Sequence, residues 1–191
     1  MILTEGVPVS SVAHPPPAPV EAMSRIVAFT GHRPDIFREP EAARDAVNTI
    51  AQNLVLHDKV EHFLVGGQRG VDSWAAQAAI DLGVPFTLIL PLDVARFTSD
   101  WPAADRALLD SIVTQAAEVW IVGPATDPAA AHTERNRQLA QQADLLVAVW
   151  TRLEGGGTAE TIALARAAGT PIREVVLPIA QIAHSRQGRG I

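Results

Sequence analysis

Six short apolar segments alternate with helix-like segments along this chain, and this alternation restricts its fold more than any other feature. The apolar segments lie at residues 25–30, 62–66, 86–90, 118–122, 145–150 and 172–177. Because they are apolar throughout, they are typical of strands that are covered on both faces. The segments with helical spacing lie between them, at residues 39–58, 72–82, 102–116, 133–142 and 158–168.

Strands that alternate with helices form βαβ units, whose right-handed crossovers give a parallel sheet with helices on both faces. We therefore predict an α/β fold, a Rossmann-like three-layer αβα sandwich with a mainly parallel sheet of about six strands. A length of 191 residues with 48% hydrophobic residues suits one ordinary domain with a well-covered core.

The two ends of the chain differ from this pattern. Residues 1–23 are rich in proline and small residues, which predicts a disordered leader. The leader is either a tether or lies upstream of a true start at Met23, and the sequence leaves both open. We assign residues 24–178 to the folded, Rossmann-like domain and residues 179–191 to a flexible tail.

Composition narrows the function classes. The chain has no cysteine, which excludes disulfides, thiolate metal sites and cysteine nucleophiles. Its formal net charge of −6 argues against nucleic acid as a partner. It has neither the ~20-residue apolar run of a membrane span nor a secretory signal, so we expect a cytoplasmic protein without a membrane partner. The six histidines lack metal-ligand spacing, and no metal site is predicted.

The loops that follow the strands hold most of the glycine, arginine and histidine residues. They read TGHRP (30–34), GGQRGVD (66–72), HTERNRQ (132–138) and EGGGT (154–158). The loops that enter the strands are compact helix stops with glycine and proline. Because ligands of parallel sheets bind at the carboxyl ends of the strands, this asymmetry predicts a binding site there.

The GGQRGVD loop has features of an anion site. Gly66 and Gly67 allow a tight turn and a close backbone approach, and Gly70 precedes a helix whose free N–H groups can receive an anion. Arg69 adds a positive charge. Asp72 is either an N-cap or a partner that fixes the loop. The alternative is a plain strand-to-helix turn capped by the aspartate.

The second glycine loop comprises Gly155, Gly156, Gly157 and Thr158. We expect Thr158 to cap the next helix, and its hydroxyl and the first-turn amides to bind phosphate. The spacing is neither the dinucleotide GxGxxG nor the P-loop GxxxxGK[ST]. The loop has no lysine, which argues against ordinary ATP or GTP hydrolysis.

The TGHRP segment supplies Thr30, Gly31, His32 and Arg33 to the same edge. His32 is a candidate general base or a ring that stacks on a nucleobase, and a structural role is equally compatible with the sequence. Arg33 precedes a proline, so it lies on an extended segment from which it can point into a cleft.

The HTERNRQ segment predicts a helix start at Thr133, with Arg135 and Asn136 in the first turn. An arginine there opposes the helix dipole, which an anionic ligand would explain; a surface arginine is the alternative. Phe97 and Trp101, in the loop after the third strand, either pack over a base or cover the sheet edge.

Four motifs in this order resemble the SLOG superfamily: VAFTGHRP, LVGGQRGVDSWAAQAA, HTERNRQLAQQADLLVAVW and GGGTAETIALARAAGTPI. This superfamily includes DNA processing protein A (DprA/Smf) and the lonely-guy (LOG) enzymes, and the YpsA-type branch is the most similar. The resemblance spans about residues 24–178. It implies a nucleotide-derived ligand, with contacts carried over to Gly66, Gly67, Gly70, Arg135, Asn136, Gly156, Gly157 and Thr158. Related domains are often dimers, which leaves a homodimer open.

The resemblance leaves four functions open. The first is a sensor or binding protein for a nucleotide or nucleotide-derived phosphorylated ligand, and the sequence identifies no specific cofactor apart from such a nucleotide ligand. The second is a LOG-like nucleoside-monophosphate phosphoribohydrolase with Arg135 and Glu160 as catalytic candidates. The LOG motif PGGxGTxxE, however, has its glutamate where this chain has Thr161, and Glu160 lies about 100° away on a helix. The third is a DprA-like single-stranded DNA-binding protein, and the fourth is a molybdenum-cofactor carrier.

Overall fold

The structure, a computed structural model, describes residues 25–124 and 126–180. The predicted leader, residues 1–23, lies outside these ranges, as do residues 181–191 of the predicted tail. The first two residues assigned to that tail are paired: Ile179 forms an antiparallel bridge with Phe37, and the Ala180 N–H donates to the Ile36 carbonyl at 2.9 Å.

Six strands form a single sheet in the order β4-β3-β2-β1-β5-β6, and every neighbouring pair is parallel. Each lies within two residues of its predicted position. Their bounds are Arg25–Gly31 (β1), Val60–Val65 (β2), Phe86–Leu90 (β3), Glu118–Ile121 (β4), Leu145–Trp150 (β5) and Ile172–Val176 (β6). The sheet confirms the predicted α/β, Rossmann-like class.

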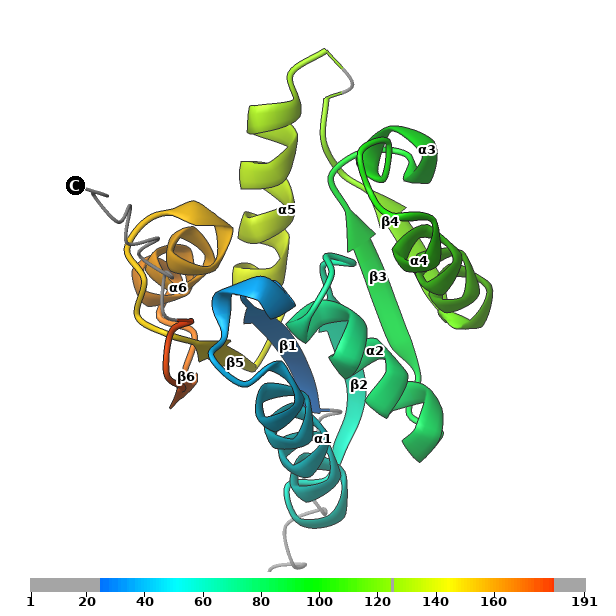
Figure 1. The fold of residues 1–191 in the computed structure, drawn as a ribbon. Helices are drawn as coiled ribbons and strands as arrows, with labels where there is room; N and C mark the ends of the chain where they lie inside the picture. The colour runs from blue at the N-terminus through cyan, green and yellow to red at the C-terminus, as the bar shows by residue number, and fades with distance from the viewer. Residues whose placement is uncertain (1–24, 125, 181–191) are drawn as a thin grey trace, which may run out of the picture.

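Helices cover both faces of the sheet (Figure 1). The helices α1, α2 and α4 pack on one face and share a core with β1, β2 and β3, while α5 and α6 pack on the other. The bounds are Pro40–His57 (α1), Val71–Leu82 (α2), Val94–Phe97 (α3), Ala103–Gln115 (α4), Pro128–Gln141 (α5) and Gly156–Ala168 (α6), with a 3-10 turn, η1, at Pro34–Ile36.

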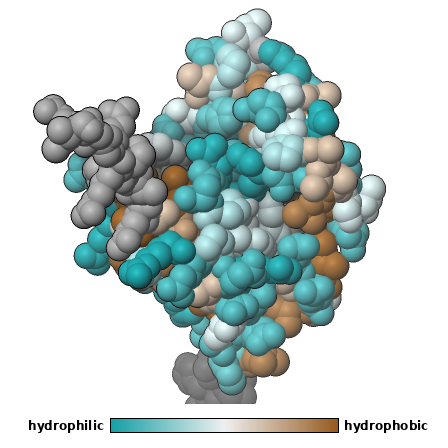
Figure 2. Space-filling view, viewed as in Figure 1, coloured by the Kyte–Doolittle hydropathy of each residue, from teal (hydrophilic) through white to brown (hydrophobic). Residues whose placement is uncertain are grey.

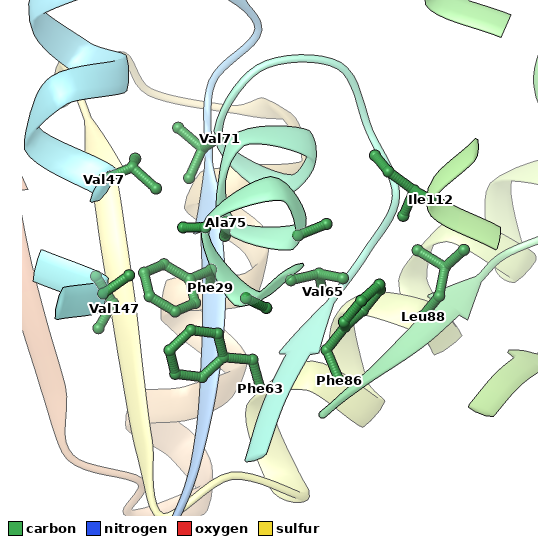
Figure 3. Close-up of a cluster of buried hydrophobic side chains, with 14 of the residues drawn as sticks. Phe29, Val47, Phe63, Val65, Val71, Ala75, Phe86, Leu88, Ile112 and Val147 are labelled. Atoms are coloured by element: carbon green, nitrogen blue, oxygen red, sulfur yellow. The ribbon is translucent and has the colours of Figure 1, made fainter. Parts of the chain in front are cut away.

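The larger core lies between the sheet and the layer of α1, α2 and α4 (Figure 3). The rings of Phe29 and Phe63, on neighbouring strands, meet edge to face with centroids 5.1 Å apart. Strands β3 and β5 are buried along their whole length, as apolar runs predict. The edge strands β4 and β6 are largely exposed, so the expectation of two covered faces is wrong for these two.

The face seen in Figure 2 is mainly hydrophilic or neutral, with hydrophobic patches on the side where α4 lies. The large hydrophobic side chains that are exposed are spread over several elements: Leu56, Val119, Ile121, Leu153, Val176 and Ile179. Among the described residues, no helix is both long and apolar enough to cross a membrane.

Helix α5 begins five residues before the predicted start. Its first residue is Pro128, and the Asp127 side chain accepts a hydrogen bond from the Ala130 N–H at 3.0 Å. Proline at the first helical position and aspartate before it are a strong helix start. Thr133 is therefore not a cap, and Arg135 and Asn136 lie in the middle of the helix. The expected conflict between Arg135 and the helix dipole does not exist.

The strand order locates a switch point at the centre of the sheet. From β1 the chain proceeds through β2 and β3 to β4 on one side, then returns to β5 on the other side of β1. The connections that leave β1 and β5 therefore diverge, and a crevice forms between the carboxyl ends of these strands. Ligands of open α/β sheets bind at such a point.

Candidate ligand-binding site

A cavity of about 300 Å³ opens at this switch point. Its walls come from the end of β1, the loop after β5, the start of α6 and the middle of α5. The lining residues are Thr30, Gly31, His32, Arg33, Ile36, Gln68, Asp72, His132, Arg135, Asn136, Leu153, Gly155, Gly156, Gly157 and Thr158. The structure thus brings together most of the residues that the sequence placed at a site, from four separate segments.

The start of α6 forms one wall. Gly155 and Gly156 have φ values of 79° and 74°, a left-handed region that side-chain-bearing residues rarely adopt. The prediction that Thr158 caps this helix is wrong, because the N-cap position is Gly155 and no side chain caps the helix. Since the first N–H groups of a helix lack intrahelical acceptors, the exposed glycines leave these donors open to a ligand.

His32 lies behind this wall, with 8% of its surface exposed. Its Nδ1 is 3.5 Å from the Thr158 hydroxyl, and its ring lies near the rings of Phe37 and Trp150, at centroid distances of 5.9 and 6.5 Å. Burial lowers the pKa of His32 below 6.5. The Nε2 atom has no hydrogen-bond partner in the described structure. Such unpaired buried groups are rare, and functional sites are one place where they persist.

Arg33 is exposed beside the cavity. Its backbone carbonyl accepts from the Ile36 N–H at 3.2 Å, but its guanidinium forms no ion pair or hydrogen bond with the residues that the structure describes. The charged lining residues are Arg33, Arg135 and Asp72, so the cavity has a positive formal charge. The whole chain has a net charge of −6, which makes this local sign the opposite of the global one.

Asp72 and Arg135 form a buried ion pair across the sheet edge. Arg135 Nη1 lies 3.1 Å from Asp72 Oδ2, and it donates to the Gly66 carbonyl at 3.1 Å. Asp72 Oδ2 also accepts from the Gln68 N–H at 3.1 Å. Burial raises the pKa of Asp72, against the opposing effects of the Arg135 guanidinium and the Gln68 N–H. Asp72 therefore fixes the loop, one of the two roles expected for it, and does not cap α2, whose N-cap is Gly70.

The first glycine loop lies behind the cavity wall, around the ion pair. A Cβ at Gly66 would overlap Arg135 Nη1 and lie 2.7 Å from Asp72 Oδ2, so this glycine makes room for the ion pair. Gly67 packs on Leu90, and Gly70 lies against the His32 carbonyl, which accepts from the Val71 N–H at 3.3 Å. The three glycines are buried and do not line the cavity.

Arg69 turns away from the cavity. Its Nη1 lies 3.3 Å from Asp105 Oδ2, and its guanidinium lies 5.6 Å from the centre of the Trp101 ring. Trp101 packs on Phe97, with centroids 5.1 Å apart, and both are buried outside the cavity lining. Of the two roles expected for these aromatic residues, the structure therefore shows the one in which they cover the sheet edge.

Glu160, the second catalytic candidate, faces α5. Its Oε1 accepts from the Thr133 hydroxyl at 2.7 Å, and its Oε2 accepts from Asn136 Nδ2 at 2.8 Å. Thr161, where LOG enzymes have their glutamate, is fully buried, and its hydroxyl donates to the Gly157 carbonyl at 2.7 Å. Glu160 lines a second cavity, on the α5 side of the glycine loop.

The sequence does not predict four of the lining residues: Ile36, Gln68, His132 and Leu153. Gln68 and His132 lie inside the GGQRGVD and HTERNRQ motifs, so their position in loops at the strand ends could have identified them as lining residues. No sequence feature identifies Ile36 and Leu153, because isolated apolar residues in loops have no characteristic pattern. In the described part of the chain, no group of three or more His, Cys, Asp or Glu residues could hold a metal ion.

Comparison with known proteins identifies one family. The model named YpsA, for the YspA SLOG family, matches residues 27–168. None of the curated proteins matches the sequence.

Several solved structures have a similar fold. DNA processing protein A (DprA) from Streptococcus pneumoniae has a TM-score of 0.59 and 20% identity over 79% of this chain and 50% of that one. The molybdenum cofactor carrier protein from Chlamydomonas reinhardtii has a TM-score of 0.53 and 21% identity, over 79% and 76% of the two chains. The molybdenum cofactor binding protein from Rippkaea orientalis has a TM-score of 0.54 and 19% identity, over 81% and 77%. The chain spans half the length of the DprA structure, and identities this low show a shared fold alone.

We expect the protein to be destabilised strongly when one partner of the buried Asp72–Arg135 pair is removed alone. R135M should lower the free energy of unfolding by about 3–5 kcal/mol, because it leaves a buried carboxylate without its counter-charge. Adding D72N should recover at least half of that loss, because the new amide oxygen can still accept from the Gln68 N–H. Urea denaturation of both single variants and the double variant measures the coupling. If the losses in the free energy of unfolding of the two single variants simply add up in the double variant, this account is contradicted.

The lowered pKa of His32 predicts acid sensitivity. Below about pH 6.5 the unfolded chain binds a proton at this residue more readily than the folded one, so the free energy of unfolding falls as pH falls. The loss is at most about 1.4 kcal/mol per pH unit. Between pH 7.5 and 5.5, urea denaturation should show a smaller loss for H32Q than for the wild type. His62, whose pKa burial also lowers, contributes to both proteins. If H32Q and the wild type lost the same unfolding free energy over this pH range, the account of His32 as a desolvated side chain would be refuted.

Proposed function

Because this chain belongs to the YspA SLOG family, we propose that it binds a nucleotide or a nucleotide-derived phosphorylated ligand at the carboxyl edge of its sheet, as a sensor or binding protein. One observation supports this most strongly: the uncapped start of α6 opens into a positively charged cavity on an acidic chain. Helix N-termini bind phosphate through free N–H groups and the positive end of the helix dipole.

The remaining groups of the cavity suit an anionic ligand. The Arg33 guanidinium has five donors and no partner among the described residues, and such a fork fits a phosphate. The Thr158 hydroxyl lies at the same wall. A cavity of about 300 Å³ is at the small end of the range for ligand pockets, which suits a phosphate with its attached group.

Binding is favoured over LOG-like cleavage by the positions of the two catalytic candidates. Arg135 is held by Asp72 and Gly66, and Glu160 is held by Thr133 and Asn136. Both side chains therefore have structural partners already, and Thr161 supplies no carboxylate. Single-stranded DNA is disfavoured by the acidic chain, since non-specific binding needs many phosphate contacts.

Two of the similar structures are described as a carrier and a binder of the molybdenum cofactor. An anionic cofactor of this kind would meet the same amides and arginine. It therefore belongs beside nucleotides among the ligands to be tested, and mass spectrometry of small molecules that co-purify with the protein would separate the two.

Arg33 offers a direct test. Calorimetric titration with 5′-AMP should show binding to the wild type, and R33A should weaken it about tenfold or more, because a hydrogen bond to a charged group is lost. R106A is the matched control, since Arg106 is exposed on α4 and does not line this cavity. The folded stability of both variants should be unchanged. An R33A protein that binds 5′-AMP and inorganic phosphate as tightly as the wild type would argue against the proposal.

A further inference from the structure

The two cavities lie side by side, because they share His132, Arg135, Asn136 and the glycine loop 155–157 in their linings. The second has a volume of about 640 Å³ and adds Ala129, Thr133 and Glu160. We infer that Glu160 binds the vicinal hydroxyl groups of a sugar bonded directly to the phosphate, so that the ligand is a ribosyl rather than a deoxyribosyl phosphate. This inference rests on the proposed function.

Glu160 is held in one orientation before any ligand arrives. The Thr133 hydroxyl donates to Oε1 at 2.7 Å and Asn136 Nδ2 donates to Oε2 at 2.8 Å. Asn136 is itself 1% exposed, so its bond to Glu160 is shielded from water. A carboxylate has about four acceptor positions, and two remain after these bonds. The half-buried Glu160 can therefore accept two further hydrogen bonds, one at each oxygen.

The spacing of α6 places this carboxylate beside a phosphate at the glycine loop. Gly157 and Glu160 are three residues apart, hence on the same side of the helix with a rise of about 4.5 Å. Helical side chains lean toward the N-terminus, so Glu160 reaches back to the first turn. Both residues line the second cavity. Glu160 thus meets the part of a ligand that is bonded to the phosphate group, and not a more distant base.

The charge of Glu160 restricts what that part can be. A second phosphate would be repelled by the carboxylate of Glu160, which lines the second cavity. Neutral hydroxyl groups avoid this repulsion and supply the donors that the free carboxylate positions need. Two hydroxyls on adjacent carbons match the two oxygens of one carboxylate, whereas a deoxyribose has lost one of the pair.

The test compares ribose 5-phosphate with 2-deoxyribose 5-phosphate by NMR titration of the ¹⁵N-labelled protein. The wild type should bind the ribose compound about tenfold more tightly, the effect of one hydrogen bond to a charged group. E160Q should bring the two affinities within about twofold of each other, because an amide presents one acceptor and one donor group. The variant should fold, since the Asn136 amide can turn over to meet the new side chain.

E154Q is the matched control. Glu154 is exposed just before α6 and lines neither cavity, so its removal changes the charge near the phosphate without changing the hydroxyl site. It should leave the ribose preference intact. Equal binding of the two sugar phosphates by the wild type, or a preference that persists in E160Q, would overturn the role of Glu160 alone. If neither sugar phosphate nor inorganic phosphate shifts the α6 amides, the proposed function itself fails.

Discussion

The arrangement of the site depends on one buried ion pair, between Asp72 at the start of α2 and Arg135 in the middle of α5. These helices pack on opposite faces of the sheet, and the pair joins them over the carboxyl end of β2. Gly66 makes the crossing feasible, because any side chain there would occupy the place of the guanidinium. A buried pair of this kind contributes less to net stability than to fixing one arrangement, since desolvation offsets much of the attraction.

Helix α5 also positions the opposite wall of the site. Consecutive helical residues point about 100° apart. Arg135 therefore reaches α2 while Asn136, its neighbour, donates to Glu160 of α6. Helix α5 thus holds α2 and α6 in fixed positions around the switch point. The uncapped start of α6 and the unpaired Arg33 face the space between them, where a ligand would complete the missing hydrogen bonds.

The sequence is sufficient to predict the sheet, because short, largely apolar runs that alternate with helical patterns are typical of parallel strands between helices. It also predicts a ligand edge, because the loop residues differ so strongly between the two ends of the strands, and the family match confirms the resemblance drawn from those motifs. The sequence-based prediction fails where one residue type can serve two structural roles. Thr133 and Thr158 have the side chains of caps, although Asp127 and Gly155 hold those positions.

The glycines of residues 66–70 illustrate a second limit. A glycine that admits a ligand and a glycine that admits a distant side chain look alike in the sequence. Only the contact between Gly66 and Arg135, which are 69 positions apart, separates the two. The anchor of Glu160 is hidden in the sequence for the same reason, because its partners lie on another helix.

The central claim is that the start of α6 is an anion site. Its most direct test is an NMR titration of the ¹⁵N-labelled protein with inorganic phosphate, followed at each backbone amide. We expect saturable shifts that are largest at Gly156, Gly157 and Thr158. If these amides do not move at millimolar phosphate, or if the largest shifts lie on another surface, the account is contradicted.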